Sequence, residues 1–437
     1  MIFEWAVFQR GKIMKLRLLG SLGLLVLGGG AQASGFALLE QNASGLGNAY
    51  AGQAASAQDA STIYYNPAGL TNIGGRQAVL SGAFIDVTAK FNGTLSPPAP
   101  LQSSLGGTGG NAGGLAALPS FYYAMDIKPG LKFGLGVNSP FGLKTDYDQS
   151  WMGRFQAVKS ELKTVNINPA LALKLNEQWS VGAGVDAQYV DATLTSMANY
   201  SALLGPSFSN LSGLSTVKGD DWSWGYNFGV LFEPSKTTRV GLNYRSCIDH
   251  DLTGTVSFAD RPAPLNAAVP DGNVTAKLTL PDSASLSYFS QLNDRFDILA
   301  DASWTHWSLF KDLTVVRDTG ATLSSTQENW SDTWRYSLGL NYHVSNALTW
   351  RFGVAYDQTP VSEVDRTARI PDQSRTQLAV GVQYRPSRQG TWDVGYSHLF
   401  ANDASISQNQ TATGAGNLVG SYNLSVDILS LQYTHTF

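Results

Sequence analysis

The side chains that most often carry acid–base, nucleophilic or metal chemistry are few and widely spaced in this chain of 437 residues. Its single cysteine, Cys247, has no partner for a disulfide, and the five histidines lack the short spacing of a metal-binding motif. No G-x-S-x-G motif occurs. We therefore expect no enzymatic activity, no metal and no cofactor, although residue types alone leave open a Ser–His pair on a barrel wall, as in a phospholipase. The histidines are His250, His306, His343, His398 and His435.

Apolar side chains in a predicted exposed loop are better candidates for function. The stretch 196–221 would connect two strands, yet it contains several large apolar residues. Exposed loops are usually polar, so this content predicts that the loop has an apolar partner, and the loop at 249–273 would be its neighbour. The alternative is that the two loops only pack on each other. The predicted ligand-binding residues here are Met197, Tyr200, Leu203, Leu204 and Phe208.

A second candidate lies where proline and glycine interrupt a predicted strand. After the apolar run 131–137, the sequence continues Asn138-Ser139-Pro140-Phe141-Gly142. Proline cannot donate a hydrogen bond to a neighbouring strand, and glycine permits a sharp bend. In a closed barrel this sequence would open a local gap in the wall. The alternative is an ordinary bulge or a strand end.

The elements that must position these residues are strands, because apolar residues alternate with small or polar ones in segments of about ten residues. One apolar face consists of Trp222, Trp224, Tyr226 and Phe228. A soluble β-sandwich also alternates. Aromatic residues at the ends of the apolar faces and small polar residues on the other face favour a transmembrane barrel.

Fourteen such segments predict a closed antiparallel β-barrel over residues 77–437, whose last strand ends at Phe437. The short connections would be periplasmic turns. The long connections would be extracellular loops, near 92–116, 196–221, 249–273, 307–331, 358–374 and 401–422.

Residues 1–33 read as a secretion signal with a basic start, an apolar core at 18–30 and a small-residue cleavage site at 31–33. Translation from Met14 would also give a complete signal. An uncleaved anchor is the alternative, but the apolar run is shorter than the roughly 20 residues of a spanning helix. Cleavage would remove four basic residues and one acidic residue, lowering the net charge from −4 to −7. A negative charge argues against nucleic acid as a partner.

Residues 34–76 show no strand alternation and are rich in Ala, Gly, Ser and Asn. This segment is too polar to span a bilayer as a helix and too rich in glycine for an exposed helix. We therefore expect it inside the lumen, as a plug. Within it, Pro67 fixes the backbone after Asn66, whose amide could join the plug to the wall. The motif Asn66-Pro67-Ala68 then has either a gating role or the plainer role of a rigid turn.

The start SGFAL, the run SGLGNAYAG and Asn66-Pro67-Ala68 resemble the N-terminal hatch of the long-chain fatty-acid transporter (FadL) family of the Gram-negative outer membrane. Residues 138–147, the run Ile370-Pro371-Asp372-Gln373 and the terminal strand also match. The resemblance implies passive transport of hydrophobic molecules, with lateral release through a kinked third strand at 138–142. It also implies that the loops at 196–221 and 249–273 form a hydrophobic groove that collects cargo, and that Phe36 closes one side of a binding pocket. A disordered terminus is the alternative for Phe36.

The resemblance further implies contact with outer-membrane lipid and lipopolysaccharide, and assembly machinery that reads the strand ending in Phe437. We expect a monomer. A bound fatty acid needs a cation for its carboxylate, but the stretches around Ser196 and Thr326, where the family has basic residues, are uncharged. The cargo is therefore open between fatty acids and neutral hydrocarbons. A general porin for polar solutes and a structural or adhesin barrel are the alternative functions. Substitute cations by location are Arg154, Lys159, Arg317 and Arg366.

Overall fold

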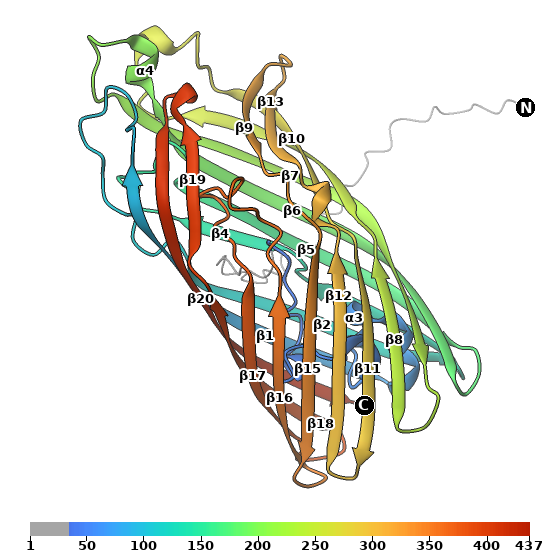
Figure 1. Cartoon of the computed structure of the whole chain (residues 1–437). Coiled ribbons are helices and arrows are strands. Elements are labelled where there is room, and N and C mark those ends of the chain that lie inside the picture. The colour runs from blue at the N-terminus through green and yellow to red at the C-terminus, as the bar shows by residue number, and fades with distance from the viewer. Residues whose placement is uncertain (1–34) are drawn as a thin grey trace, which may run out of the picture.

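The computed structural model describes residues 35–437, so the predicted signal lies outside the described residues. The described chain forms a closed, strongly tilted barrel of fourteen antiparallel strands (Figure 1). The ring closes where the first strand pairs with the last, from Gln77↔Thr436 to Leu95↔Leu418. No helix in residues 35–437 is long and apolar enough to cross a membrane.

Six of the fourteen barrel strands are each divided into two segments, namely β3/β4, β8/β9, β10/β11, β12/β13, β14/β15 and β18/β19. The strands are β1 (Gln77–Leu95), β2 (Gly114–Lys128), β3 (Leu131–Asn138), β4 (Gly142–Asp146), β5 (Lys159–Lys174), β6 (Trp179–Asn199), β7 (Ser212–Phe232), β8 (Thr238–Arg245), β9 (Ile248–Phe258), β10 (Gly272–Leu280), β11 (Ser283–Asn293), β12 (Phe296–Thr305), β13 (Asp312–Arg317), β14 (Thr322–Gln327), β15 (Thr333–His343), β16 (Leu348–Asp357), β17 (Arg375–Tyr384), β18 (Gly390–Ala401), β19 (Ala404–Gln410) and β20 (Gly416–Thr436).

The predicted outward face is present. Trp222, Trp224, Tyr226 and Phe228 of β7 are all exposed, and β15, β16 and β18 present matching exposed rows of aromatic and aliphatic residues. The intervening positions face the lumen and are mostly small or polar. Apolar-out and polar-in alternation is the arrangement of a barrel whose outer surface meets lipid.

Four of the predicted long loops are wrong in extent, because strands continue into them. Residues 196–221 contain the end of β6, helix α4 (Tyr200–Leu204) and the start of β7. Residues 249–273 are largely β9 and β10, residues 307–331 contain β13 and β14, and residues 401–422 contain β19 and the start of β20. These extensions form the upper end of the barrel in Figure 1. They pair with one another because extended backbone must find hydrogen-bond partners there as in the lower wall.

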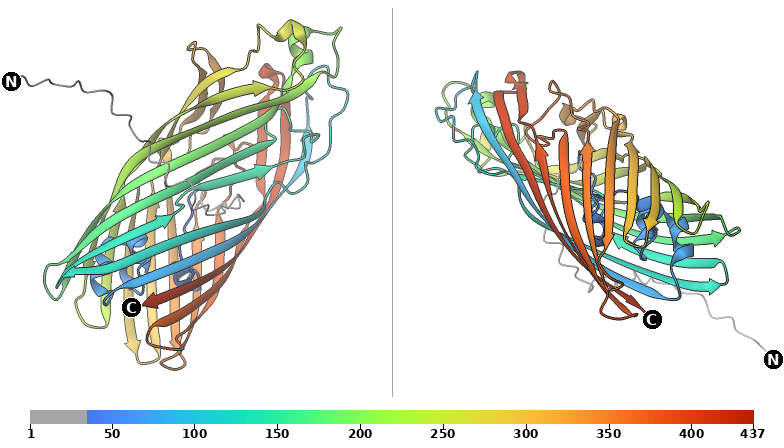
Figure 2. Two further views of the ribbon diagram at one scale, coloured as in Figure 1. Left: turned by 180° about the vertical axis from the view of Figure 1, so that it is seen from behind. Right: turned by 60° about the horizontal axis from the view of Figure 1, so that its bottom comes forward.

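The segment from Gly35 to Arg76 lies largely inside the ring of strands; its first residues reach the level of β4, and the part from residue 42 onward occupies the lower half of the lumen (Figures 1 and 2). Nearly all of its side chains from Phe36 to Leu70 are buried. Its short helices are α1 (Ala43–Leu46), α2 (Gln53–Ser56), α3 (Thr62–Tyr65) and the 3-10 turn η2 (Pro67–Asn72). The other 3-10 turns are η3 (Ala263–Leu265), η4 (Trp307–Leu309) and η5 (Thr411–Thr413).

Glycines on the lumen face of the wall bring this segment into close contact with the strands. A Cβ at Gly353 would overlap the backbone of Asn48, and one at Gly381 would lie 2.8 Å from the Cα of Gly47. Only glycine permits two backbones to approach so closely. The Asn48 amide also donates to the carbonyl oxygens of Leu340 (3.2 Å) and Phe352 (3.3 Å). The segment from about residue 42 to residue 72 is therefore fitted to the wall at many points.

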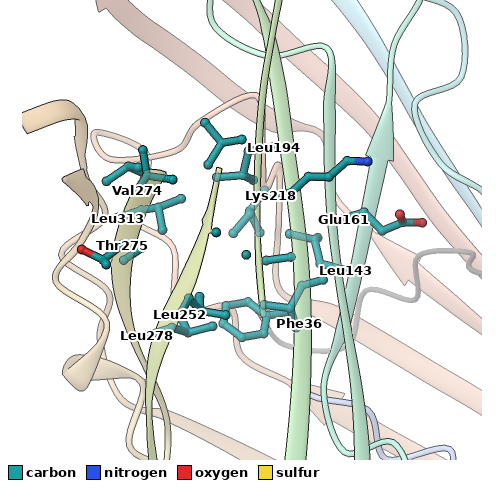
Figure 3. Close-up of a pocket in the computed structure, with 18 of the residues that line it drawn as sticks. Phe36, Leu143, Glu161, Leu194, Lys218, Leu252, Val274, Thr275, Leu278 and Leu313 are labelled. Atoms are coloured by element: carbon teal, nitrogen blue, oxygen red, sulfur yellow. The ribbon is translucent and has the colours of Figure 1, made fainter. Parts of the chain in front are cut away.

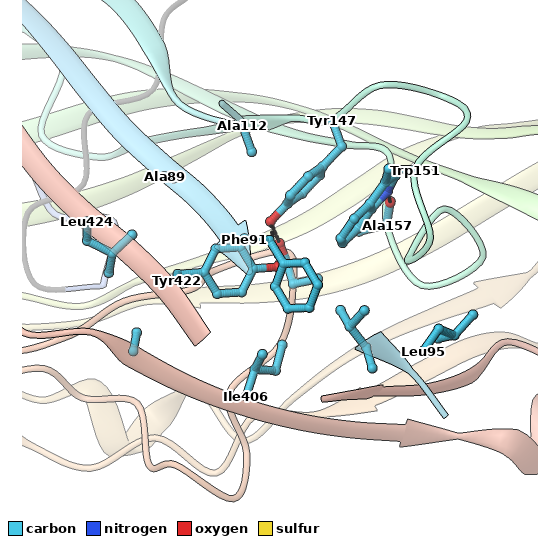
Figure 4. Close-up of a cluster of buried hydrophobic side chains, with 13 residues drawn as sticks. Ala89, Phe91, Leu95, Ala112, Tyr147, Trp151, Ala157, Ile406, Tyr422 and Leu424 are labelled. Atoms are coloured by element: carbon cyan, nitrogen blue, oxygen red, sulfur yellow. Dashed lines mark hydrogen bonds between the residues drawn. The ribbon is translucent and has the colours of Figure 1, made fainter. Parts of the chain in front are cut away.

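Part of the upper lumen is filled by aromatic rings. Tyr147 and Trp151 stack with ring centroids 4.0 Å apart; Trp151 packs on Phe91 of β1, and Tyr147 packs on Tyr422 of β20 (Figure 4). The Tyr147 hydroxyl donates to the carbonyl oxygen of Ala368 at 2.6 Å. This cluster holds the connection after β4 against the wall and leaves the lumen beside β6, β7, β9 and β10 for the pocket described next.

Candidate functional site

An apolar pocket occupies the upper lumen, with a cavity volume of about 70 Å³ (Figure 3). Phe36 forms one side of it. The pocket is lined by Phe36, Leu143, Glu161, Leu162, Ala192, Leu194, Val217, Lys218, Gly219, Leu252, Gly254, Val274, Thr275, Ala276, Leu278, Phe310, Leu313, Val315 and Ile370.

The pocket is apolar because the two faces of the long strands exchange character along their length. In the lower half of β6 the lumen face carries Asp186 and Gln188, both buried in a polar lumen. Higher on the same face come Val190, Ala192 and Leu194, while the outer face becomes polar at Asp191. The strand keeps its two-residue period throughout. One unbroken strand thus presents an apolar surface to the upper lumen and a polar surface to the lower lumen.

Phe36 is held by an aromatic box. Its ring centroid lies 4.7 Å from that of Trp307, 5.6 Å from Trp330, 5.8 Å from Phe310 and 6.1 Å from Phe141. Most of these contacts are edge-to-face, the geometry that aromatic pairs prefer. Phe36 is 2% exposed, so its ring is buried in the box rather than free at a chain terminus.

The backbone around Phe36 pairs with the interruption between β3 and β4. The Leu38 amide donates to the Pro140 carbonyl at 2.8 Å, and the Gly142 amide donates to the Phe36 carbonyl at 2.9 Å. Ala37 and Phe141 form the isolated bridge between these two bonds. Residues 36–38 thus act as a short additional strand on the lumen side of the interruption. We call residues 35–41 the latch.

The Gln41 side chain completes this contact. Its Nε2 donates to the Ser139 carbonyl at 2.9 Å, and the Ser139 amide donates to its Oε1 at 3.3 Å. The backbone of Phe141 bonds to the Thr164 hydroxyl of β5 instead. The Phe141 amide donates to this hydroxyl at 3.1 Å, and the hydroxyl donates to the Phe141 carbonyl at 2.6 Å. Backbone groups that the barrel ladder leaves open between residues 139 and 142 are therefore satisfied chiefly by the latch, as buried polar groups require.

The wall is interrupted on one side of this region. β3 pairs with β2 only as far as Phe121↔Val137, and within the described chain β4 pairs with β5 alone. The upper part of β2, from Gly114 to Ser120, therefore lacks a ladder partner on the side that faces β4. Pairing resumes above at a single bond from the Asp146 amide to the Ala112 carbonyl at 2.9 Å. The interruption predicted at Pro140 is present, and it lies between β2 and β4.

Asn66 joins the N-terminal segment to the wall. Its Nδ2 donates to the carbonyl oxygens of Ala54 (2.6 Å) and Val230 on β7 (3.0 Å), and its Oδ1 accepts from the Ala68 amide at 3.0 Å. Pro67 and Ala68 are buried against Gly182 of β6. The motif therefore sits in the anchored part of the segment, away from the latch.

A buried acidic residue lies beyond the aromatic box. Glu328 is 1% exposed, and its Oε2 accepts from the Trp330 indole N–H at 3.1 Å. Burial raises the pKa of Glu328 to about 8, against the opposing effects of that hydrogen bond and of the Arg369 charge. Burial also lowers the pKa of Arg369 to about 10, and the Glu328 charge opposes this shift. The charges of Glu328 and Arg369 therefore interact, and Arg369 directly precedes Ile370, which lines the pocket.

The structure places the predicted loop residues outside the apolar pocket. Tyr200 is fully buried and donates its hydroxyl to the Ala259 carbonyl at 2.7 Å, while Met197 packs on a small cluster with Phe155. Leu203 and Phe208 are exposed on α4 and the turn that follows, and Leu204 is half-buried. Of the predicted site residues, only Phe36 lines the pocket, with Phe141 packed beside it.

The cations predicted by location do not enter the pocket either. Arg154 bonds to the carbonyl oxygens of Ser104, Leu105 and Trp151, and Lys159 pairs with Glu161 at 3.0 Å. Arg317 donates to the Pro270 carbonyl at 2.9 Å, and Arg366 donates to the Asp372 carbonyl at 3.0 Å. The basic residue among the lining residues is Lys218, whose ammonium points away from the apolar side chains in Figure 3.

Several residues of the site were not predicted from sequence. Trp307, Phe310 and Trp330 lay in a predicted loop, and Pro119 lies on the unpaired part of β2. Three large aromatic residues close together in a loop, and a proline within a strand, are signals that could have identified them.

Comparison with known proteins identifies the family. Residues 24–437 match the family model described as outer membrane protein transport protein (OMPP1/FadL/TodX). The chain belongs to this family. Its members are transporters rather than enzymes, and the chain is therefore a β-barrel of the outer membrane that transports hydrophobic substrates.

Individual relatives agree with this assignment. The chain is 30% identical over 415 residues to the long-chain fatty acid transport protein of Escherichia coli O6:H1, covering 87% of this chain and 90% of the relative. It is 31% identical to outer membrane protein P1 of Haemophilus influenzae, covering 86% and 88%. A crystal structure of a Pseudomonas aeruginosa FadL homologue superimposes with a TM-score of 0.85 at 30% identity, over 92% of this chain and 99% of that one. The Ralstonia pickettii toluene transporter TbuX shares the fold, with a TM-score of 0.67 at 21% identity over 92% and 100% of the two chains.

Proposed function

We propose that this protein carries long apolar molecules, fatty acids and related hydrocarbons, passively across the outer membrane and releases them sideways into the bilayer. The observation that carries the proposal is the position of Phe36. One residue closes the apolar pocket with its ring and, through its carbonyl oxygen, bonds the strand beside the wall interruption. Movement of this residue would open the pocket and uncover the interruption together.

The proposed route has three stages. Cargo first adsorbs to the exposed apolar side chains near α4, including Leu203 and Phe208. It then enters the pocket, where apolar burial stabilises it by about 25 cal/mol for each Å² removed from water. Release of the latch finally joins the pocket to the region between β2 and β4. The names of the Escherichia coli relative and of the P. aeruginosa homologue support fatty acids as one cargo class.

The N-terminal segment beyond the latch would stay in place as a hatch during this cycle. Its contacts with the wall at Gly353 and Gly381 are backbone contacts, and Asn66 bonds it to β7. Displacing it would break many of these at once, whereas releasing the latch breaks the contacts of residues 35–41 alone. The smaller movement is the better candidate for a passive cycle.

A general porin for polar solutes is the contrasting function, and proteoliposomes separate the two. Purified barrel should deliver a radiolabelled long-chain fatty acid or hydrocarbon to the lipid phase, and the same vesicles should swell little in isotonic sugar. Rapid swelling in sugar without delivery of apolar cargo would contradict the proposal. Empty vesicles and vesicles with heat-unfolded barrel are the controls.

A further inference from the structure

A second cavity lies behind the latch, and its lining is more polar than that of the apolar pocket. Its cavity volume is about 100 Å³. Ala37, Leu38 and Leu39 of the latch line it on one side, next to Pro140 and Phe141 of the wall interruption. The latch therefore separates two chambers: the apolar pocket touches Phe36, and the second cavity touches the residues that follow it.

The wall of this second chamber is polar over four neighbouring strands. β8 contributes Asn243, β11 contributes Ser285, β12 contributes Asp301 and β15 contributes Arg335. The opposite side is aromatic, with the rings of Tyr50, Tyr64 and Tyr65 from the N-terminal segment. A chamber with one polar and one aromatic side suits a molecule that has both an apolar chain and a polar end.

Asn243 is the residue that points to a ligand. It is 8% exposed, and its Oδ1 is buried without a hydrogen-bond partner among the described residues. Its cross-strand neighbours are Ser285 and Gly229, and Gly229 has no side chain that could reach it. A buried amide oxygen without a partner is unfavourable unless something else in the cavity bonds it.

The other polar groups of the wall make some hydrogen bonds within the protein and could make more. Both oxygens of Asp301 accept hydroxyl groups, from Ser287 and Ser303. Arg335 donates from Nη2 to the Ala49 carbonyl and to Gln377, each at 2.8 Å, and makes no ion pair in the part of the chain described. A guanidinium has five N–H donors. The chamber thus offers a free acceptor at Asn243 and unused cationic donors at Arg335.

We infer that this second chamber receives the oxygenated end, a hydroxyl or carboxyl group, of an amphiphilic hydrocarbon as it passes the opened latch. The inference rests on the proposed function and adds a head-group site to it. The apolar pocket holds the chain, and the polar ends of its lining residues Glu161, Lys218 and Thr275 point away from its apolar side chains (Figure 3). Asn243 and Arg335 would bond the head group when the latch moves, so that it is never left unpaired in an apolar surrounding.

Three cargoes of equal chain length test this in proteoliposomes: hexadecane, 1-hexadecanol and hexadecanoate. Asn243→Leu keeps the side-chain volume similar and removes no bond that Asn243 makes within the described chain, so the barrel should fold. We expect delivery of the alcohol and the acid to fall about tenfold, while delivery of the alkane stays within twofold, since a site built for a hydrogen bond discriminates strongly between such analogues.

Ser285→Ala, directly across from Asn243, should act in the same direction. Ser430→Ala is the matched control, because the Ser430 hydroxyl is also buried without a hydrogen-bond partner among residues 35–437 but lies on β20, outside the chamber. Equal delivery of all three cargoes by the parent and Asn243→Leu would overturn the head-group site and leave the proposed function standing. An equal loss of all three cargoes in Asn243→Leu would also overturn it. Failure of the parent barrel to deliver any of them would instead contradict the proposed function.

Discussion

The Gly142 amide donates a hydrogen bond of 2.9 Å to the carbonyl oxygen of Phe36. This bond links the residue that closes the apolar pocket to the strand beside the wall interruption. The ring of Phe36 thus closes the pocket, while its carbonyl oxygen holds the latch on the wall interruption. The predictions below test this link, the anchoring of the hatch and the electrostatics around the pocket.

Phe36→Ala should weaken ligand binding without unfolding the barrel. The substitution removes the ring that forms one side of the pocket and empties the box around Trp307 and Trp330. We expect the Kd for a long-chain hydrocarbon to rise about tenfold, equivalent to about 1.4 kcal/mol. Tryptophan fluorescence titration would measure it. Phe91→Ala is the control, because Phe91 is also buried among aromatic rings but does not line the pocket. A similar rise in both variants would show that the effect is not local.

Pro119→Val with Pro140→Val should slow lateral delivery. Both prolines lie where β2 and β4 are unpaired, and each replacement adds a backbone donor and a residue that favours strands. We expect slower hydrogen exchange at residues 114–120 and at least tenfold slower transfer of cargo to lipid, with binding unchanged. Pro169→Val, on the neighbouring strand β5, is the matched control. Restored pairing with parental delivery would argue for an axial route.

Gly353→Ala should dislodge the hatch. The added methyl group would overlap the backbone of Asn48, and backbone cannot move aside as a flexible side chain can. We expect sugar-driven swelling of proteoliposomes to rise well above that of the parent, because the lower lumen would no longer be filled. Gly82→Ala is the control, since its Cβ would meet nothing within 4 Å. Unchanged swelling in Gly353→Ala would mean that the hatch is not held by this contact.

Glu328→Gln should remove a pH dependence of stability. The pKa of Glu328 is raised from 4.5 to about 8 in the folded protein, so the unfolded chain loses the proton first. Its contribution to the free energy of unfolding therefore falls as pH rises from about 4.5 to 8, by roughly 1.4 kcal/mol per pH unit. Urea unfolding in lipid should show the variant equal to the parent near pH 4.5 and more stable at pH 8. A difference that does not grow over this range would contradict the assigned pKa.

The sequence was sufficient for the barrel because its signal is local. The alternation at Trp222, Trp224 and Tyr226 specifies a strand and its outward face without knowledge of any neighbour. Pro140 likewise marks the strand interruption by itself, since proline cannot take part in the ladder.

The upper parts of the strands and the pocket required three-dimensional information. At Asp191 the outer face of β6 turns polar. The alternation of apolar and polar residues is lost beyond this point, and the sequence therefore predicts a loop from residue 196 although the strand continues to Asn199. The pocket lining comes as one to three residues from each of several strands, such as Leu194, Leu252 and Leu278. Only the register of the pairing brings such residues together. The second chamber likewise requires the fold, because it brings Asn243 and the latch residues to the lining of one cavity.

The central claim, that the latch must separate from the wall interruption for cargo to leave, is tested most directly by a reversible cross-link. Ala37 and Phe141 form a non-hydrogen-bonded antiparallel pair, because the bonds at Leu38–Pro140 and Phe36–Gly142 flank them. Cα atoms in such a pair lie about 4.5 Å apart, within the range of a disulfide. Ala37→Cys with Phe141→Cys, in a Cys247→Ser background, would lock the latch while leaving Phe36 in the pocket.

Delivery of a long-chain hydrocarbon to the lipid of proteoliposomes is the measurement, before and after reduction of the same preparation. Mass spectrometry would confirm complete cross-linking, and the reduced form controls for loss of the Phe141 ring. The predicted result is that the oxidised barrel still binds the hydrocarbon but delivers almost none, and that reduction restores delivery. Delivery by the fully oxidised barrel at the rate of its reduced form would contradict the account.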